Sequence, residues 1–150
     1  MLGTWNSELK NYLFFMAEEK KLKILIVDDD KFILSLYAAK FKAGGLDVTT
    51  AASGMEAIEK IKSGGDPDII IADIVMPLMD GIQFLEKLRE EKLAEDSIIV
   101  MLTNQDQQTD IDRAKKMKVA GYVVKVSTIP SEVVTQVLNI YKERKKLIKS

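Results

Sequence analysis

Cysteine and histidine are both absent from the 150 residues of the chain, and each absence removes a class of chemistry. Without cysteine the protein has no disulfide bonds and no thiolate ligands for a metal ion. Without histidine it has no imidazole to act as a general base, to bind zinc or to carry a phosphoryl group. These absences exclude zinc hydrolysis, serine–histidine catalysis and self-phosphorylation on histidine.

Long apolar runs and a large excess of either charge are missing as well. No stretch approaches the roughly 18 uninterrupted apolar residues of a membrane-spanning helix, and the N-terminus lacks the basic start and apolar core of a signal peptide. The 22 basic and 23 acidic residues leave a formal net charge of −1, which favours neither nucleic acid nor a membrane as a partner. We expect a cytoplasmic protein with one ordinary core, since 47% of its residues are hydrophobic.

From residue 22 onward, short β-branched runs alternate with segments whose apolar residues recur every three or four positions. The candidate strands are residues 23–27, 47–51, 68–72, 97–102 and 121–125. The segments between the strands contain residues typical of helix starts, which are Asp30, Ser53 and Thr109. They also contain residues typical of helix ends, which are Gly44-Gly45 and Gly64-Gly65. This alternation predicts an α/β fold, a doubly wound parallel sheet with helices on both faces.

Polar side chains stand at the ends of four candidate strands. They are Asp28 and Asp29 after the first, Asp73 after the third, Thr103 after the fourth and Lys125 at the end of the fifth. Because ligands of open parallel sheets bind beyond the carboxyl ends of the strands, we expect these side chains to converge. Carboxylates suit Mg²⁺, an aspartate can attack phosphorus, and a hydroxyl and an ammonium can hold a phosphoryl group. The pattern therefore indicates chemistry on phosphate.

Four motifs in order along residues 22–148 together resemble the receiver domain of bacterial response regulators. They are VDDD after the first strand, IIIADIVMPLMDG around Asp73, VMLTN with Thr103, and GYVVK with Tyr122 and Lys125. The spacings are also typical of receivers, since Asp73 lies 44 positions after Asp29, 30 before Thr103 and 52 before Lys125. The resemblance implies a five-stranded, flavodoxin-like (βα)5 fold with strand order 2-1-3-4-5, which periodicity alone does not supply.

The resemblance further implies a magnesium-dependent phosphorylation site. Asp73 is then the phospho-accepting aspartate. Asp29, Asp73 and the backbone carbonyl of Val75 would be direct Mg²⁺ ligands, and Asp28 would hold the ion mainly through water. Lys125 would supply an ammonium, because the attack of a carboxylate on a phosphoryl group meets an electrostatic barrier that positive charge must lower.

A two-state switch is the second implication of the resemblance. Thr103 would turn its hydroxyl toward the phosphoryl group, Tyr122 would move inward, and the surface of the fourth helix, fifth strand and fifth helix would change. The protein would take its phosphoryl group from a histidine kinase or a histidine phosphotransfer protein and signal to a downstream target protein. It would not be an enzyme, although it would assist its own phosphorylation and slow dephosphorylation. A homodimer is left open.

Two features concern the residues that flank the expected site. Receivers usually carry proline after the conserved lysine, on a cis peptide bond, whereas this sequence has Val126; we therefore predict a trans bond between Lys125 and Val126. Val75 and Gln105 stand where receivers place the side chains that flank the path of the hydrolytic water. Neither can serve as a base, so we expect slow self-dephosphorylation.

Residues 1–21 lie outside the resemblance, and we interpret them as an N-terminal extension. Several apolar residues there share one helical face: Leu2, Trp5, Leu9, Tyr12, Leu13 and Met16. The sequence from Met16 onward resembles an ordinary receiver start. The first fifteen residues are therefore either an upstream extension or a short amphipathic helix for docking or dimerisation.

Three functions remain open at this point. The first is a stand-alone receiver, and the second is a receiver fragment of a larger response regulator or hybrid histidine kinase. The third is an aspartyl-phosphate phosphatase of similar topology. The third is least favoured, because nothing in the sequence forms a cap domain over a substrate and the Thr, Tyr and Lys positions are typical of receivers.

Overall fold

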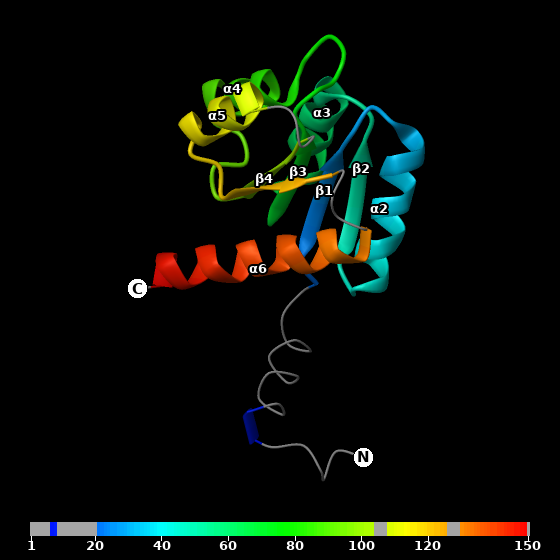
Figure 1. Ribbon diagram of the computed structural model, residues 1–150, viewed down its shortest axis with the longest axis vertical. Coiled ribbons are helices and arrows are strands. Elements are labelled where there is room, and N and C mark those ends of the chain that lie inside the picture. Colours follow the sequence, from blue (N-terminus) through cyan, green and yellow to red (C-terminus); the bar gives the residue numbers. More distant parts are fainter. Residues whose placement is uncertain (1–6, 9–20, 104–107, 126–129, 150) are drawn as a thin grey trace.

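The computed structural model describes residues 7–8, 21–103, 108–125 and 130–149 (Figure 1). One parallel sheet has the strand order β2-β1-β3-β4-β5. Its strands are β1 (Lys23–Val27), β2 (Asp47–Ala51), β3 (Ile69–Asp73), β4 (Ile98–Thr103) and β5 (Gly121–Val124). The helices that follow them are α2 (Lys31–Ala43), α3 (Gly54–Gly64), α4 (Gly81–Glu90), α5 (Gln108–Lys116) and α6 (Pro130–Lys149). The predicted fold class and strand order are confirmed.

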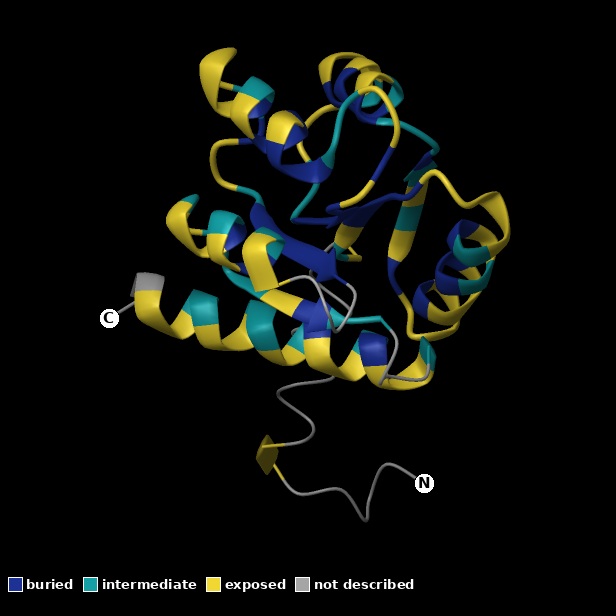
Figure 2. Cartoon of the chain, turned by 45° about the horizontal axis from the view of Figure 1, so that its top comes forward, coloured by how far each residue is buried: buried dark blue, intermediate teal, exposed yellow. Residues whose placement is uncertain are grey.

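The sheet separates two apolar layers. Residues from α2 and α6 pack on one face, and residues from α3, α4 and α5 pack on the other. Along β1 the side chains alternate between the layers, with Leu25 and Val27 in one and Ile24 and Ile26 in the other. The central strands are dark blue in Figure 2, and every residue of β3 and β4 is buried. Because both faces are covered, these strands are continuous apolar runs that hold the strand ends in fixed positions.

The predicted strand bounds differ from the observed ones by one residue at three strands. β3 begins and ends one residue later than expected, so that Asp73 is its last residue. β4 likewise extends to Thr103, and β5 ends at Val124, directly before Lys125. Asp73 and Thr103 are therefore the last residues of their strands, and Lys125 directly follows β5.

Two of the three predicted helix starts are confirmed, and one is wrong. The Asp30 side chain accepts hydrogen bonds from the backbone N–H groups of Phe32 and Ile33, which begins α2. Ser53 caps α3 in the same way. Thr109, however, lies inside α5, because that helix already includes Gln108. The ends of helices vary by one or two residues, and the residue types alone do not define them more precisely.

Glycines end the first two helices as predicted. Gly44 is the C-cap of α2, and the next residue, Gly45, has φ +90°. Gly65 caps α3 with φ +87°. Positive φ strains residues with a side chain, so these two glycines allow the chain to turn directly into the following segment.

The longest described helix, α6, runs across the face of the sheet that α2 shares (Figure 1). Its first half buries Val133 and Val137 in the core, whereas Leu147 near its end is 71% exposed. Among the described residues, no helix combines the length and the apolar character needed to cross a bilayer.

Candidate functional site

The carboxyl ends of four strands bring the expected site residues to one edge of the sheet. Asp28 and Asp29 follow β1, Asp73 ends β3, Thr103 ends β4 and Lys125 follows β5. These four strands are neighbours in the sheet, with β1 beside β3, β3 beside β4, and β4 beside β5. The predicted convergence is therefore what the topology produces.

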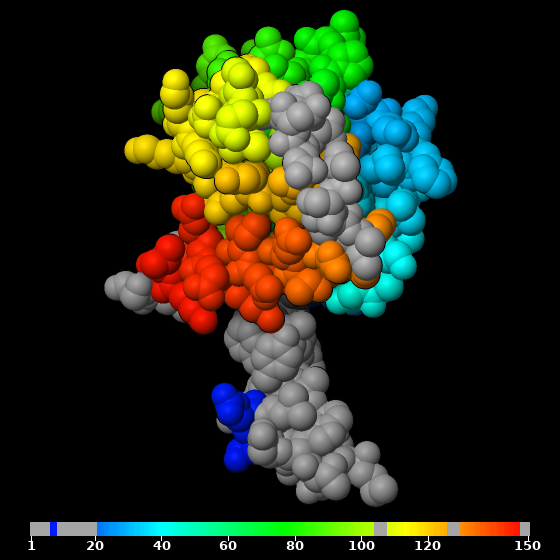
Figure 3. Space-filling view, viewed as in Figure 1, coloured from blue at the N-terminus to red at the C-terminus, as the bar shows by residue number. Residues whose placement is uncertain are grey.

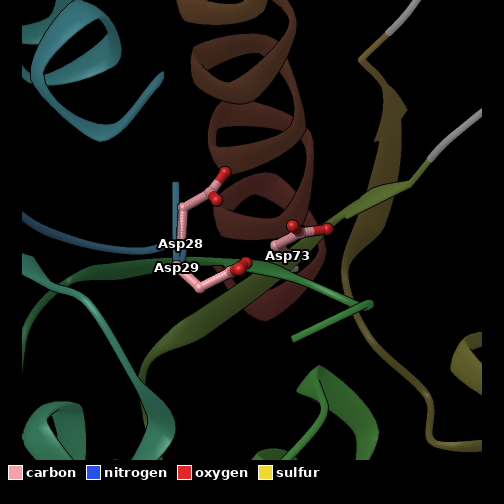
Figure 4. Close-up of side chains that lie close together, drawn as sticks. All are labelled: Asp28, Asp29 and Asp73. Carbon is pink, nitrogen blue, oxygen red and sulfur yellow. The ribbon is translucent and has the colours of Figure 1, made fainter. Parts of the chain in front are cut away.

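Three carboxylates form the acidic part of the site. Each of Asp28, Asp29 and Asp73 offers an oxygen atom, and these oxygens all lie within 4.8 Å of one another. Figure 4 shows the two carboxyl groups at the end of β1 together with that of Asp73 at the end of β3. Asp28 is fully buried and Asp73 is 7% exposed, whereas Asp29 is exposed. The cluster is thus accessible to solvent mainly from the side of Asp29.

Lys125 bridges the two buried carboxylates. Its ammonium donates to Asp28 Oδ2 at 2.9 Å and to Asp73 Oδ2 at 3.3 Å. The other oxygens accept backbone hydrogen bonds, Asp28 Oδ1 from the N–H of Asp30 at 2.9 Å and Asp73 Oδ1 from the N–H of Val75 at 3.3 Å. Each buried carboxylate therefore has one ionic and one backbone partner.

The charges of the site are strongly coupled. Burial raises the pKa of Asp73 to about 6, and the negative charge of Asp28 adds to the rise, although Lys125 and the Val75 N–H oppose it. Burial alone would lower the pKa of Lys125. The hydrogen bond to Asp28 and the charges of both carboxylates outweigh that effect, so the pKa of Lys125 lies above its usual value. Lys125 therefore stays charged at neutral pH, while Asp73 is close to titration.

The raised pKa of Asp73 predicts an unusual pH dependence of stability without metal. Between about pH 4 and pH 6 the folded protein holds a proton that the unfolded chain has released, so stability falls as pH rises. At pH 7 the ionised, buried Asp73 carboxylate lowers the free energy of unfolding by up to about 3 kcal/mol. We expect Asp73→Asn, which cannot ionise, to be more stable than wild type at pH 7 in a chelator, as measured by urea unfolding.

The control for this prediction is pH itself. Near pH 4 the Asp73 carboxyl is protonated in the folded wild type, so the two proteins should unfold at similar urea concentrations. Asp68→Asn serves as a matched substitution, because Asp68 accepts a backbone hydrogen bond far from the site. A stability gap between wild type and Asp73→Asn that is the same at both pH values would contradict the assignment of the cost to ionised Asp73.

The donor set fits a divalent, oxygen-preferring cation. Three carboxylates face a single ammonium, which leaves two negative charges uncompensated within the cluster. Mg²⁺ prefers carboxylate and carbonyl oxygens and retains several waters, which the exposed side of the cluster can accommodate. The described residues could therefore hold a metal at this position.

The two side chains that we expect to move on phosphorylation, Thr103 and Tyr122, lie in different environments. Thr103 is 2% exposed at the end of β4. Tyr122 is 38% exposed on β5, where its Cα pairs with that of Met101, two residues before Thr103. The Lys115 ammonium lies 5.5 Å from the centre of the Tyr122 ring. The tyrosine is thus on the surface, next to α5.

Two sequence predictions concern residues outside the described part of the chain. Val126 lies there, so the isomer of the bond between Lys125 and Val126 stays a prediction. Gln105 lies there as well. Val75, the other residue expected beside the hydrolytic water, is described: its side chain is 49% exposed.

Asp80, a residue for which the sequence patterns above predict no role, organises the loop behind Asp73. Asp80 and Gln83 form a capping box at the start of α4, in which each side chain accepts a hydrogen bond from the other residue's backbone N–H. The carboxylate of Asp80 also lies 3.4 Å from Arg113 of α5. The spacing Asp-x-x-Gln before an apolar helix is a capping signal that could have identified it.

Comparison with known proteins identifies relatives of the chain. A family model for the response regulator receiver domain matches residues 24–137. The chain is 40% identical over 88 residues to the alkaline phosphatase synthesis transcriptional regulatory protein PhoP of Bacillus subtilis, covering 59% of this chain and 35% of that protein. It is 33% identical over 123 residues to response regulator SaeR of Staphylococcus aureus, covering 82% and 52%. The chain therefore spans about half or less of the length of these relatives.

Solved structures resemble the fold along most of the chain. The chemotaxis protein CheY4 of Vibrio cholerae superposes with a TM-score of 0.73 at 28% identity, covering 81% of this chain and 99% of that one. A putative response regulator from Chloroflexus aurantiacus gives a TM-score of 0.73 at 31% identity, covering 82% and 99%. These structures share the CheY-like arrangement of five parallel strands and their helices.

Proposed function

The chain belongs to the response regulator receiver family of two-component signalling systems, and on this basis we propose that Asp73 is its phosphorylation site. The observation that carries the proposal is the group of three carboxylates within 4.8 Å with Lys125 bound to two of them. Asp29, Asp73 and the Val75 carbonyl would bind Mg²⁺ directly, and Asp28 would bind it mainly through water. The bound ion would neutralise charge on the incoming phosphoryl group.

The proposed reaction is phosphoryl transfer from a phosphohistidine to a carboxylate. An oxygen of Asp73 forms a bond to phosphorus while the bond from phosphorus to the donor imidazole breaks, and the electron pair stays on the imidazole nitrogen. The Lys125 ammonium already lies 3.3 Å from Asp73 Oδ2, so it can stabilise the negative charge that develops on the phosphoryl oxygens during transfer. Residues 1–150 contain no histidine, so the phosphohistidine lies outside them, in a histidine kinase or a histidine phosphotransfer protein.

The response to phosphorylation would be a change of surface. The Thr103 hydroxyl would turn toward the phosphoryl group, and Tyr122 would leave its exposed position and move inward. This changes the surface of α5, β5 and α6, which are the fourth helix, fifth strand and fifth helix of the domain. A downstream target protein would bind the changed surface.

The receiver domain would extend over residues 22–148, with residues 1–21 as an extension. The two curated relatives are longer than this chain, which fits a receiver that serves as one part of a larger response regulator. A receiver within a hybrid histidine kinase and a stand-alone receiver that acts in the cytoplasm through a partner are the alternatives. The length of the native reading frame decides between them.

The test of the function is phosphorylation by acetyl phosphate, followed by intact mass. We expect wild type to gain one phosphoryl group with Mg²⁺ and none with excess chelator. Asp73→Ala should gain none, whereas Asp68→Ala, which changes a carboxylate remote from the site, should behave as wild type. Phosphoryl uptake by Asp73→Ala, or uptake in chelator, would refute the proposal.

The lifetime of the phosphorylated state gives a second prediction. Val75 offers no donor or acceptor to orient a water, and its half-exposed methyl groups can exclude one from the phosphorus. We expect Val75→Asn, which can orient a water, to lose its phosphoryl group about three- to tenfold faster than wild type. Decay is followed by mass in Mg²⁺ after the donor is removed.

Val75→Ile provides the control, since it keeps an apolar, branched side chain at the same place. Its decay should match that of wild type. If Val75→Asn loses its phosphoryl group at the wild-type rate or more slowly, the side chain of Val75 does not keep water from the bond between Asp73 and phosphorus. Only the backbone of Val75 would then contribute to the site.

A further inference from the structure

A groove of about 520 Å³ lies at the edge of the sheet where β4 and β5 begin. Ile98, the first residue of β4, lines the groove, as does Ala120, which directly precedes β5. The phosphorylation site lies at the opposite edge, where the parallel strands end, and the six residues of β4 separate the two edges by about 16 Å. The groove is therefore a separate feature that the proposed function does not use.

Six charged residues from three parts of the chain line this groove. Figure 3 shows two of these parts, the end of the yellow α5 and the red end of α6, on the same side of the molecule. Four basic and two acidic residues give the lining a formal charge of +2, although the net charge of the chain is −1. They are Arg89 at the end of α4, Glu95 and Asp96 before β4, Lys118 before β5, and Arg144 and Lys145 in α6.

These six side chains do not neutralise one another. None of them forms an ion pair with another residue that the structure describes, so the nitrogens of the basic members lie more than 4.0 Å from the oxygens of Glu95 and Asp96. The four cations repel one another across the groove. A ligand with negative groups between them removes that repulsion, and N–H donors on the same ligand can pair with the carboxylates.

Helix ends account for only part of the positive charge. Basic side chains are favourable in the last turn of a helix, which explains Arg89 in α4, and the effect extends to Lys118 just after α5. Arg144 and Lys145 precede the last turn of α6. Arg144 donates a hydrogen bond to the Val119 carbonyl at 3.3 Å, but a carbonyl does not cancel the charge of a guanidinium. The positive charge of the groove therefore needs another reason.

The backbone around the groove is held in place. The N–H of Ser97 donates to the Ala94 carbonyl at 3.1 Å, and the N–H of Ala120 donates to the Ile99 carbonyl at 2.9 Å. Ala94 and Lys118, which both line the groove, have φ of 52° and 57°. This left-handed conformation is unfavourable for residues with a side chain and persists where the surrounding structure fixes it. The groove is thus formed before any ligand binds.

The size and floor of the groove indicate an organic ligand rather than a bare ion. Small-molecule sites have volumes of about 300–1,000 Å³, with apolar walls and a few charged groups that orient the ligand. Leu85, Leu88 and Ile98 line the groove and are each at most 4% exposed. A phosphate ion would leave most of this volume and all of the apolar floor without a contact.

We propose that the groove binds a nucleoside phosphate. The guanidinium groups of Arg89 and Arg144 present paired N–H donors that match phosphate oxygens. The sugar and the base would lie on the apolar floor. An ionised carboxylate only accepts hydrogen bonds, so Glu95 or Asp96 would bind N–H groups of the base, and guanine offers two of these side by side. The inference goes beyond the proposed function and does not rest on it.

The experiment titrates the full chain with guanosine diphosphate by calorimetry, in chelator and at low salt. Without metal, the three carboxylates of the phosphorylation site repel the nucleotide, so the groove is the site that is measured. We expect Arg89→Gln/Lys145→Gln to weaken binding about tenfold or more. Lys40→Gln/Lys42→Gln makes the same charge change on exposed residues of α2 and should weaken binding about twofold or less.

Pyrophosphate separates the contribution of the nucleoside from that of its phosphates, because it carries negative charge but no base. Glu95→Ala/Asp96→Ala should bind guanosine diphosphate about threefold or more weakly than wild type, since the acceptors for the base are gone. The same variant should bind pyrophosphate as tightly as wild type or more tightly, because two repelling charges are removed.

Three results would overturn the proposal. The first is a lack of saturable binding of guanosine diphosphate, and the second is equal weakening by the two lysine-containing variants, which would show that only net charge matters. The third is unchanged affinity for guanosine diphosphate after removal of the two carboxylates, which would leave a site for phosphate alone. If Arg89→Gln/Lys145→Gln does not fold, the single exposed change Lys118→Gln should weaken binding about threefold, and an unchanged affinity would overturn the proposal as well. Failure of acetyl phosphate to modify Asp73 refutes only the proposed function.

Discussion

Gly81→Ala should destabilise the protein by about 3 kcal/mol or more, a large part of the stability of an ordinary domain. A Cβ atom at this position would lie 2.3 Å from the carbonyl oxygen of Asp73 and 2.9 Å from the Cα of Ile74. Both obstacles are backbone atoms, so no side-chain rotation relieves the clash. The Gly81 N–H also donates to the Ile74 carbonyl at 2.7 Å, which holds the two ends of the loop together. Urea unfolding followed by circular dichroism measures the loss.

The clash also predicts a functional loss, because the displaced backbone is that of Asp73. In the fraction of Gly81→Ala that still folds, phosphorylation by acetyl phosphate should be slower than in wild type. Gly64→Ala is the matched control. Within the described part of the chain, a Cβ at Gly64, which ends α3, would have no atom within 4 Å beyond its chain neighbours and its own helix backbone, so alanine should leave stability unchanged or raise it by about 0.5–1 kcal/mol. Equal stability of Gly81→Ala and wild type would show that the loop can shift at little cost.

The strand-end residues could be predicted from the sequence because two simple rules determine their place. Parallel strands end at one edge, and a β-branched run of about five residues identifies each strand. An error of one residue at the bounds of β3 and β4 leaves the predicted site unchanged, since the polarity of Asp73 and Thr103 already places them where apolar strands end. The strand order came from the family resemblance, because the hydrophobic pattern is the same for every order of buried strands.

Contacts between distant segments could not be predicted in this way. The approach of Gly81 to Asp73 depends on how the loop between β3 and α4 folds back, and no local pattern encodes a distance between backbone atoms. The pairing of Lys115 with Tyr122 and of Arg113 with Asp80 likewise depends on the angle at which α5 packs. The even charge balance of the sequence argues against polyanions, yet nine of the 22 basic residues lie in residues 113–118 and 142–149. The hydrogen bond from Arg144 to the Val119 carbonyl brings these two segments together.

Lys125→Met should cost about 3 kcal/mol or more of stability at pH 8 in the absence of metal. Methionine keeps the length of the side chain but leaves Asp28, which is fully buried, without its 2.9 Å ionic partner. Asp73 loses its ammonium as well. An unpaired buried charge is costly, because the interior does not replace the solvation that water gave it. The variant should unfold at a lower urea concentration than wild type.

The loss should shrink at pH 5. Lys125 lowers the pKa of Asp73, which is about 6 in the wild type, so removing the ammonium raises that pKa further. The folded variant then binds a proton over a higher pH range than the folded wild type, and its stability recovers as pH falls through that range. Mg²⁺ should also restore stability at pH 8, since it supplies positive charge to the same carboxylates.

A double-mutant cycle separates the charge from the packing of the lysine stem. Because the cost arises from the unpaired Asp28 carboxylate, Lys125→Met should destabilise the Asp28→Asn background by about 1–2 kcal/mol less than it destabilises wild type. Lys125→Arg keeps a cation near both carboxylates and should lose less stability than Lys125→Met at pH 8. If Lys125→Met costs the same in both backgrounds and at both pH values, then the aliphatic part of Lys125 stabilises the fold by packing, and its ammonium is held at the site for the phosphoryl group rather than for stability.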